Sequence, residues 1–280
     1  MKTITVALST FLFVSINITS CKQETKTENN IPVEETVVKI KSEDLTYDSD
    51  TAKLVGFVSY NENAKEKLPV ILIVHEWWGL NDYAKNRAKQ LADLGYLAFA
   101  IDMYGDGQTA DNPGDAQKLA TPFYQNPVGA NARVQAALTK IKSLAQADTN
   151  KIMAIGYCFG GSMVLNAAKG GLNLNGVVSF HGGLAGLTPE KGKTIADVLV
   201  CHGAADQFVP ATDVAKFKTQ MDSVGASYKF IEYADATHAF TNPDATENGK
   251  KFNIPIAYNE KADKASWKDM LAFFEKVLKK

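Results

Sequence analysis

Arginine is nearly absent from this chain of 280 residues, and no dense run of basic residues occurs. Of the 30 basic side chains, all but Arg87 and Arg133 are lysines, and the formal net charge is −1 at pH 7. Proteins that bind nucleic acid carry clustered positive charge that neutralises the phosphates. The composition therefore predicts no nucleic-acid partner. With 45% hydrophobic and 22% charged residues, the chain suits one globular domain with a large core.

Long apolar runs are scarce as well. An apolar stretch from Ile4 to Ile18 follows Lys2, but it is too short to cross a bilayer comfortably as a helix. Small residues follow and end at Cys21, so residues 1–20 are predicted to be a secretory signal peptide. The junction resembles the lipobox of bacterial lipoproteins, in which the cysteine is lipidated and begins the mature chain. We expect an exported, membrane-anchored lipoprotein of the cell envelope; plain cleavage is the alternative.

Residues 21–36 have few bulky apolar side chains and many polar or charged ones. Such a segment cannot bury enough apolar surface to offset the entropy lost on ordering. It is predicted to be a flexible tether that begins at the lipidated cysteine. The folded domain then comprises residues 37–280, and no internal repeat is apparent in it.

Within this domain, short β-branched runs alternate with segments of helical periodicity. The predicted strands are 37–40, 52–60, 70–74, 96–101, 152–155, 176–180, 198–201 and 228–233, and the predicted helices are 81–95, 130–144, 210–225 and 267–278. The first two strands are expected to form an antiparallel pair. Residues 104–128 are rich in Gly, Pro, Asn and Asp, and are expected to form a lid or crossing loop with a short helix. The alternation predicts an α/β fold with a mostly parallel, doubly wound sheet.

The most informative segment is residues 151–163, KIMAIGYCFGGSM. An apolar strand runs into Gly156-Tyr157-Cys158-Phe159-Gly160 and then into a segment of helical character, which matches the Gly-x-nucleophile-x-Gly elbow of α/β hydrolases. Such a turn presents Cys158 at the carboxyl end of the strand, and the Phe159 N–H and the helix start favour negative charge there. A phosphate-binding turn or an inert buried cysteine are the alternatives for this motif alone.

The chain has four histidines, at positions 75, 181, 202 and 238. In this fold class the chain order is nucleophile, acid, base, which excludes the first, and the next two have no suitable acid before them. Asp206 follows the strand at 198–201, and His238 follows the strand at 228–233. We therefore predict a triad of Cys158 as nucleophile, His238 as base and Asp206 as its orienting acid. Asp235 is a competing acid, but it shares a loop with His238 and is assigned to a turn.

Together with the elbow, three further segments carry a resemblance over about residues 37–280. These are Val74 to Asn81 (VHEWWGLN), Gly203 to Pro210 (GAADQFVP) and His238-Ala239-Phe240. In these motifs the chain resembles the dienelactone hydrolase family. The resemblance implies an α/β-hydrolase fold without a cap domain and hydrolysis of small esters or lactones with no metal or other cofactor. It assigns the triad as above, oxyanion donors to the N–H groups of Trp77 and Phe159, and to Glu76 an interaction with the resting cysteine.

The chain departs from the family at the position four residues after the triad histidine. There the family has an arginine that holds a substrate carboxylate, whereas this chain has Asn242. Arg87 and Arg133 fall on predicted helices and are interpreted as solvated, so an uncharged substrate is expected. Cys201 is predicted to be buried core. In the family's strand order another strand separates it from Cys158, which implies that no disulfide joins them.

The sequence thus favours a lipid-anchored cysteine hydrolase of small esters or lactones. The alternative is a binding lipoprotein of the same fold that recognises a small molecule without turning it over. A redox thiol protein would need a second cysteine close to Cys158. No feature of the sequence defines an oligomeric state.

Overall fold

The computed structural model describes residues 38–49, 52–193 and 196–279. The predicted signal peptide, the lipidation site at Cys21 and the predicted tether lie outside the described residues, as does Val37. Among the described residues, no helix is both long enough and apolar enough to cross a membrane.

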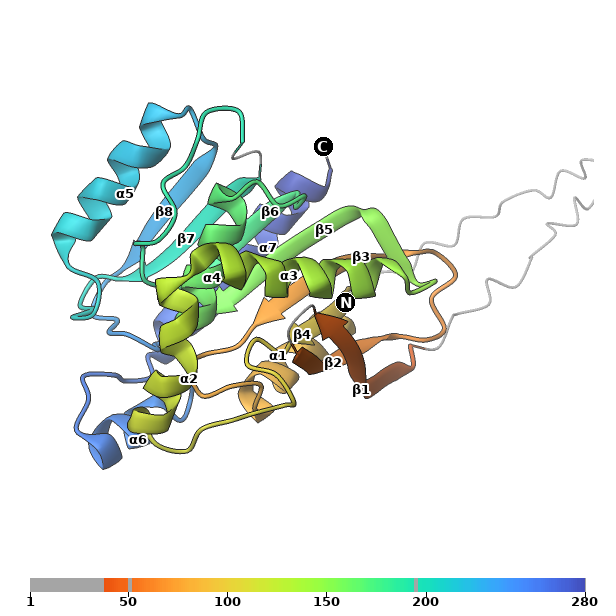
Figure 1. Ribbon diagram of the computed structural model, residues 1–280, viewed down its shortest axis with the longest axis horizontal. Helices are drawn as coiled ribbons and strands as arrows, with labels where there is room; N and C mark the ends of the chain where they lie inside the picture. The colour runs from red at the N-terminus through yellow and green to blue at the C-terminus, as the bar shows by residue number, and fades with distance from the viewer. Residues whose placement is uncertain (1–37, 50–51, 194–195, 280) are drawn as a thin grey trace, which may run out of the picture. The chain divides into compact units, whose positions relative to one another are not determined.

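An eight-stranded sheet forms the centre of the domain, with the strand order β1-β2-β4-β3-β5-β6-β7-β8 (Figure 1). The strands are β1 (Ile40–Ser49), β2 (Ala52–Asn61), β3 (Leu68–Val74), β4 (Leu97–Ile101), β5 (Ala147–Tyr157), β6 (Gly176–Phe180), β7 (Asp197–Gly203) and β8 (Tyr228–Tyr233). The helices are α1 (Asp82–Asp93), α2 (Pro113–Gln125), α3 (Pro127–Lys142), α4 (Phe159–Lys169), α5 (Ala211–Ser223), α6 (Ala245–Phe252) and α7 (Glu260–Leu278). β1 pairs with β2, and β2 with β4, in antiparallel fashion, and all other pairs are parallel. The predicted α/β-hydrolase fold is confirmed.

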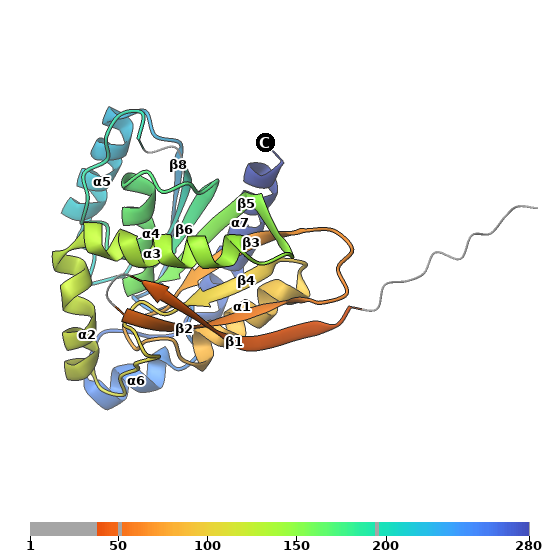
Figure 2. The ribbon, with the colours of Figure 1, turned by 45° about the vertical axis from the view of Figure 1, so that its right-hand side comes forward.

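Helices cover both faces of the sheet (Figures 1 and 2). One buried cluster joins the sheet to α3, α4 and α5, and the other joins it to α1 and α7. β3 shows how the sequence produces this arrangement. Its residues from Val70 to Val74 are fully buried, and alternate side chains enter opposite clusters: Leu72 lies in the first cluster, and Ile71 and Ile73 lie in the second. Because both faces are covered, the strand is a continuous apolar run.

The antiparallel pair at the start was predicted, but the bounds of its first strand were wrong. β1 runs from Ile40 to Ser49, not from 37 to 40, and pairs with β2 along its whole length. β1 is an edge strand, and only Tyr47 in it is buried. A strand exposed in this way lacks the apolar run by which buried strands are found.

The region 104–128 also differs from the prediction, because it holds the complete helix α2 and the start of α3. Each helix begins with the same signal: Asn112 accepts a hydrogen bond from Asp115 N, Asn126 accepts one from Gly129 N, and a proline follows each asparagine. Asparagine at the N-cap with proline at the first helical position is a favourable helix start. The many turn-forming residues obscured two such starts in close succession. The short helix α6 was not predicted, and only two of its residues are buried.

Candidate active site

The turn between β5 and α4 holds Cys158 in a strained backbone conformation, with φ 52° and ψ −114°. Two glycines make this turn possible. A Cβ on Gly156 would lie 2.1 Å from the Gly160 carbonyl oxygen, and a Cβ on Gly160 would lie 2.2 Å from the Val74 carbonyl oxygen. No residue with a side chain fits at either position unless the backbone shifts. The strand, sharp turn and helix predicted from the motif are present.

The structure brings the three predicted triad residues together from the ends of three strands. His238 Nε2 lies 3.0 Å from Cys158 Sγ, and His238 Nδ1 lies 2.8 Å from Asp206 Oδ2. The other carboxylate oxygen of Asp206 accepts a hydrogen bond from Phe208 N at 2.9 Å. Asp235, the competing acid, is exposed at a positive φ of 59° in the same loop as His238, as expected of a turn residue.

The surroundings of His238 favour its protonated form. Burial alone lowers the pKa of this imidazole, but the charge of Cys158 and the hydrogen bond that His238 donates to Asp206 outweigh that effect and raise its pKa to about 10. Cys158 itself is partly exposed. A cysteine in contact with an imidazole is the arrangement that a cysteine nucleophile requires.

The two candidate oxyanion donors lie on segments that are tied together. Phe159 N–H is the first of α4 and has no partner within the helix, because the first four N–H groups of any helix lack one. Trp77 follows β3, and its carbonyl oxygen accepts a hydrogen bond from the Tyr104 hydroxyl at 2.9 Å. Gly160 N donates to His75 O at 3.1 Å and so joins the start of α4 to this segment. The segments that carry the two N–H groups are therefore neighbours.

Glu76 is buried beside the predicted triad, and its side chain is hydrogen-bonded to Asn242, which stands where the resemblance predicts an arginine. Its Oε2 accepts a hydrogen bond from Asn242 Nδ2 at 2.6 Å. Burial raises the pKa of this carboxyl to about 7, although the Asn242 bond acts in the opposite direction. In this arrangement the hydrogen bond of Glu76 is with Asn242, while the thiol is paired with His238.

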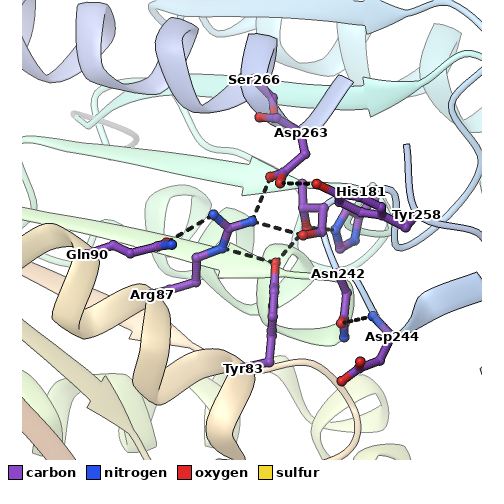
Figure 3. Close-up of polar contacts among 10 residues, drawn as sticks. Tyr83, Arg87, Gln90, His181, Asn242, Asp244, Tyr258, Asp263 and Ser266 are labelled. Carbon is purple, nitrogen blue, oxygen red and sulfur yellow. Dashed lines mark hydrogen bonds and ion pairs between the residues drawn. The ribbon is translucent and has the colours of Figure 1, made fainter. Parts of the chain in front are cut away.

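The interpretation of Arg87 as a solvated residue is wrong. Its Nη2 donates to Asp263 Oδ1 at 2.6 Å (Figure 3) and to Thr241 O at 2.9 Å. Its guanidinium packs over the Trp267 ring. It lies on the buried face of α1, which it shares with Ala84, Ala88 and Leu91. The helical spacing of Arg87 from these apolar residues could have predicted its burial from the sequence, because an arginine on an apolar stripe is placed to reach a buried acceptor.

Arg133 is half-buried on α3, and its guanidinium donates to the hydroxyl of Ser49 in β1. The hydrogen bonds described for both arginines thus lie outside the predicted triad. Cys201 is buried and forms no disulfide, and burial raises the pKa of its thiol to about 12. Because β6 lies between β5 and β7, the prediction that no disulfide joins Cys201 to Cys158 is confirmed.

His181 is the residue near the candidate site that sequence reasoning missed. It was rejected as the base for lack of an acid, yet its Nδ1 accepts a hydrogen bond from the backbone N–H of Cys158 at 3.0 Å. The side chain is fully buried, and Nε2 lies 2.7 Å from Thr241 Oγ1. This hydrogen bond joins a side chain that follows one strand to the backbone that follows the neighbouring strand. No local sequence pattern reveals such a contact.

A mostly parallel sheet covered on both faces, with a strained cysteine elbow and an acid and a histidine after later strands, defines the class of α/β hydrolases. Within that class, residues 54–278 match the model of the dienelactone hydrolase family, and the chain belongs to this family.

Relatives agree with the assignment. The chain is 28% identical over 239 residues to the "Putative carboxymethylenebutenolidase" of Aquifex aeolicus, which covers 83% of this chain and 97% of that protein. A solved structure of a dienelactone hydrolase-like promiscuous phosphotriesterase from metagenomic libraries is 31% identical and has a TM-score of 0.80, covering 85% of this chain and 98% of that one. A dienelactone hydrolase-like structure from Klebsiella pneumoniae, 24% identical with a TM-score of 0.70, covers 85% of this chain and 99% of its own and agrees in fold.

Proposed function

We propose that this protein hydrolyses small, uncharged carboxylic esters or lactones through Cys158. The observation that carries the proposal is the hydrogen-bonded series from Cys158 Sγ through the imidazole of His238 to Asp206, with distances of 3.0 and 2.8 Å. A nucleophile, a base and an acid that orients the base form the minimal apparatus for acyl transfer.

The chemistry follows from these positions. The Cys158 thiolate attacks the carbonyl carbon, and the carbonyl oxygen gains negative charge that the N–H groups of Phe159 and Trp77 are proposed to stabilise. The tetrahedral intermediate expels the alkoxide, which takes the proton from His238 Nε2. His238 then removes a proton from water, which attacks the thioester carbonyl. The carboxylic acid leaves, and the thiolate and imidazolium are restored.

Hydrolysis of a p-nitrophenyl ester by the purified protein tests this proposal. Cys158→Ala should remove nearly all turnover, whereas Cys201→Ala, which removes a buried thiol on β7, should leave it intact. Equal activity of Cys158→Ala and wild type would overturn the proposal. If no ester is turned over but small lactones bind, the alternative of a non-catalytic binding protein is the better description.

Asn242 supports the preference for an uncharged substrate. A carboxylate in a pocket is held by charge-assisted hydrogen bonds, each worth about 1.5–3 kcal/mol. Asn242 offers only a neutral amide, which is already bonded to Glu76, and Phe208 is 52% exposed with its ring 5.0 Å from that of His238. Near the triad, these side chains suit an apolar, neutral acyl group.

A competition assay tests the preference. An uncharged short-chain ester or lactone should show a kcat/KM about ten-fold or more above that of a carboxylate-bearing dienelactone. Asn242→Arg supplies a cation at this position and should shift the ratio towards the anionic lactone. A wild-type preference for the anion would contradict the role given to Asn242 and leave the proposed triad unaffected.

A second candidate substrate is a neutral phosphotriester. The support is the phosphotriesterase structure, which is similar along nearly its whole length. Like an ester, a phosphotriester gains negative charge on one oxygen when a nucleophile attacks it. It carries no carboxylate, so its binding needs no cation in the pocket. Release of p-nitrophenol from paraoxon, abolished in Cys158→Ala, would support this activity at the same site; no release above the Cys158→Ala background would exclude it.

We also propose that the protein is a lipoprotein of the bacterial cell envelope, anchored through Cys21. Lipidation supplies a lasting membrane attachment that a cleaved signal peptide cannot. Cys21→Ser should release the protein from the membrane fraction. If that variant still sediments with membranes, the anchor is not at this cysteine.

A further inference from the structure

The nucleophile's backbone is held by a second histidine, which takes no part in the proposed proton transfers. His181 directly follows β6, and the Cys158 N–H donates to both Phe180 O and His181 Nδ1, each at 3.0 Å. Because a backbone N–H can only donate, Nδ1 must be the unprotonated nitrogen of the ring. The neutral ring therefore carries its proton on Nε2.

Thr241 is placed to accept that proton's hydrogen bond. Its Oγ1 lies 2.7 Å from His181 Nε2 and 2.7 Å from the Tyr83 hydroxyl. Both of these partners are labelled in Figure 3. The Tyr83 hydroxyl in turn receives a hydrogen bond from Arg87 Nε at 3.4 Å, and Arg87 Nη2 holds the Thr241 carbonyl at 2.9 Å. Thr241 is thus fixed through both its side chain and its backbone. It is also fully buried, so water does not compete for the hydroxyl.

The state of this ring matters for the geometry of the elbow. Cys158 adopts a positive φ that a residue with a side chain rarely takes, so its peptide groups need partners that hold them. Its backbone orientation directs Sγ towards His238, and that of the following peptide directs the Phe159 N–H. A proton on Nδ1 would face the Cys158 N–H and break the hydrogen bond. Burial, followed by the positive charges of His238 and Arg87, keeps the pKa of His181 well below its usual range, so the ring stays neutral.

We propose that His181 is a positioning residue of the reaction, which aligns the Cys158 backbone through Nδ1, and that Thr241, held by Tyr83 and Arg87, fixes the tautomer this requires. The inference rests on the proposed role of Cys158 as nucleophile. His181 contacts neither the thiol nor the substrate in this scheme. Loss of the alignment should therefore lower kcat and leave KM nearly unchanged, because the attack geometry is affected and ground-state binding is not.

Thr241→Val is the most direct test, since valine has the shape of threonine but no hydroxyl. We expect kcat for a p-nitrophenyl ester to fall about ten-fold or more with KM within about two-fold, and Thr241→Ser to restore kcat. Ser266→Ala is the matched control. It removes a buried hydroxyl near this network that donates to Asp263 O, and should change thermal stability without changing kcat. Wild-type kcat in Thr241→Val would overturn the role of the hydroxyl.

His181 itself gives a second pair of variants. The amide oxygen of His181→Asn can accept the Cys158 N–H bond, whereas the side chain of His181→Leu cannot, so kcat should fall less in the first. Equal kcat values in two folded variants would contradict the proposal. The wild-type protein provides a test that needs no variant: its imidazole ¹⁵N spectrum should show His181 neutral and protonated on Nε2 between about pH 5 and 9. A proton on Nδ1 would overturn the inference.

These results separate the two proposals. If Cys158→Ala retains full activity, the proposed function fails. If Cys158→Ala is inactive while Thr241→Val and His181→Leu retain the wild-type kcat, only the positioning role fails.

Discussion

The nucleophile elbow and the histidine loop meet at the 3.0 Å contact between Cys158 and His238, but they are built in different ways. The elbow, residues 156–160, is defined by its own glycines, which let β5 and α4 approach closely. The histidine loop, residues 234–244, depends on distant segments: His238 O accepts from Ala257 N, Phe240 O accepts from Asn259 N, and Thr241 O accepts from Arg87. Local sequence determines one half of the candidate site, and long-range contacts determine the other half.

This difference has a practical consequence. A change in the elbow acts on the backbone directly, because there is no space for a larger residue. A change in the histidine loop acts through contacts made by α1, α7 and the segment between α6 and α7.

The largest effect is expected at His238, the residue of the histidine loop that contacts Cys158 in the elbow, and at its partner Asp206. His238→Ala should lower kcat on the order of ten-thousand-fold, and Asp206→Asn should lower it less, because the asparagine side chain still contacts the imidazole. Steady-state kinetics with a p-nitrophenyl ester measure both. Asp235→Asn is the control from the same loop, since that carboxylate is exposed and should not affect kcat. If kcat fell as much in Asp235→Asn as in Asp206→Asn, the assignment of Asp206 as the orienting acid would be wrong.

The next effect concerns the elbow alone. Gly160→Ala would place a Cβ 2.2 Å from the Val74 carbonyl oxygen, and we expect it to lower the free energy of unfolding by more than about 4 kcal/mol. Gly192→Ala is the comparison: φ is +78° there, but nothing lies within 4 Å of the added carbon. Its cost should be about 1 kcal/mol, from backbone strain only. Urea denaturation measures both, and similar costs would show that close packing does not define the elbow.

Arg87→Met tests the histidine loop. It removes the donor to Thr241 O and leaves Asp263, whose side chain is only 15% exposed, without this partner. Removal of one member of a buried ion pair typically costs about 3–5 kcal/mol. Arg133→Met removes a half-buried contact to Ser49 and should cost about 1 kcal/mol. Equal losses of unfolding free energy in the two variants would mean that Arg87 does not anchor the loop.

The smallest effect is expected at Glu76, which is bonded to Asn242 of the histidine loop and follows His75, whose carbonyl oxygen accepts a hydrogen bond from Gly160 N of the elbow. Because burial raises the pKa of this carboxyl from 4.5 to about 7, the folded state retains a proton that the unfolded state has already lost. Stability must therefore fall as pH rises through this interval, by about 3 kcal/mol in total. Glu76→Gln should remove this dependence. Urea midpoints measured in parallel from about pH 4 to 8 give the difference, and parallel curves for wild type and variant would contradict it.

Much of the fold was readable from local patterns. The buried run of β3, the Asn81 start of α1 and the periodic face of α7 each carry a signal within a few residues. The failures have equally local causes. β1 lies at an edge and shows no apolar run, and the two helix starts at Asn112 and Asn126 follow each other so closely that they resembled a loop.

For the candidate site, the elbow motif and the order of acid and histidine along the chain predicted Cys158, Asp206 and His238 from the sequence alone, because each follows the end of a strand. The placement of Arg87 on the apolar stripe of α1 was also present in the sequence and was misread. In contrast, the bonds of His181 to the Cys158 backbone and of Glu76 to Asn242 join residues 23 and 166 positions apart. Such bonds depend on which strands and loops become neighbours, and no periodicity or motif encodes them. The sequence thus pointed to the candidate reactive groups, and the packing of the folded chain determined their partners, since burial and proximity exist only once the chain has folded.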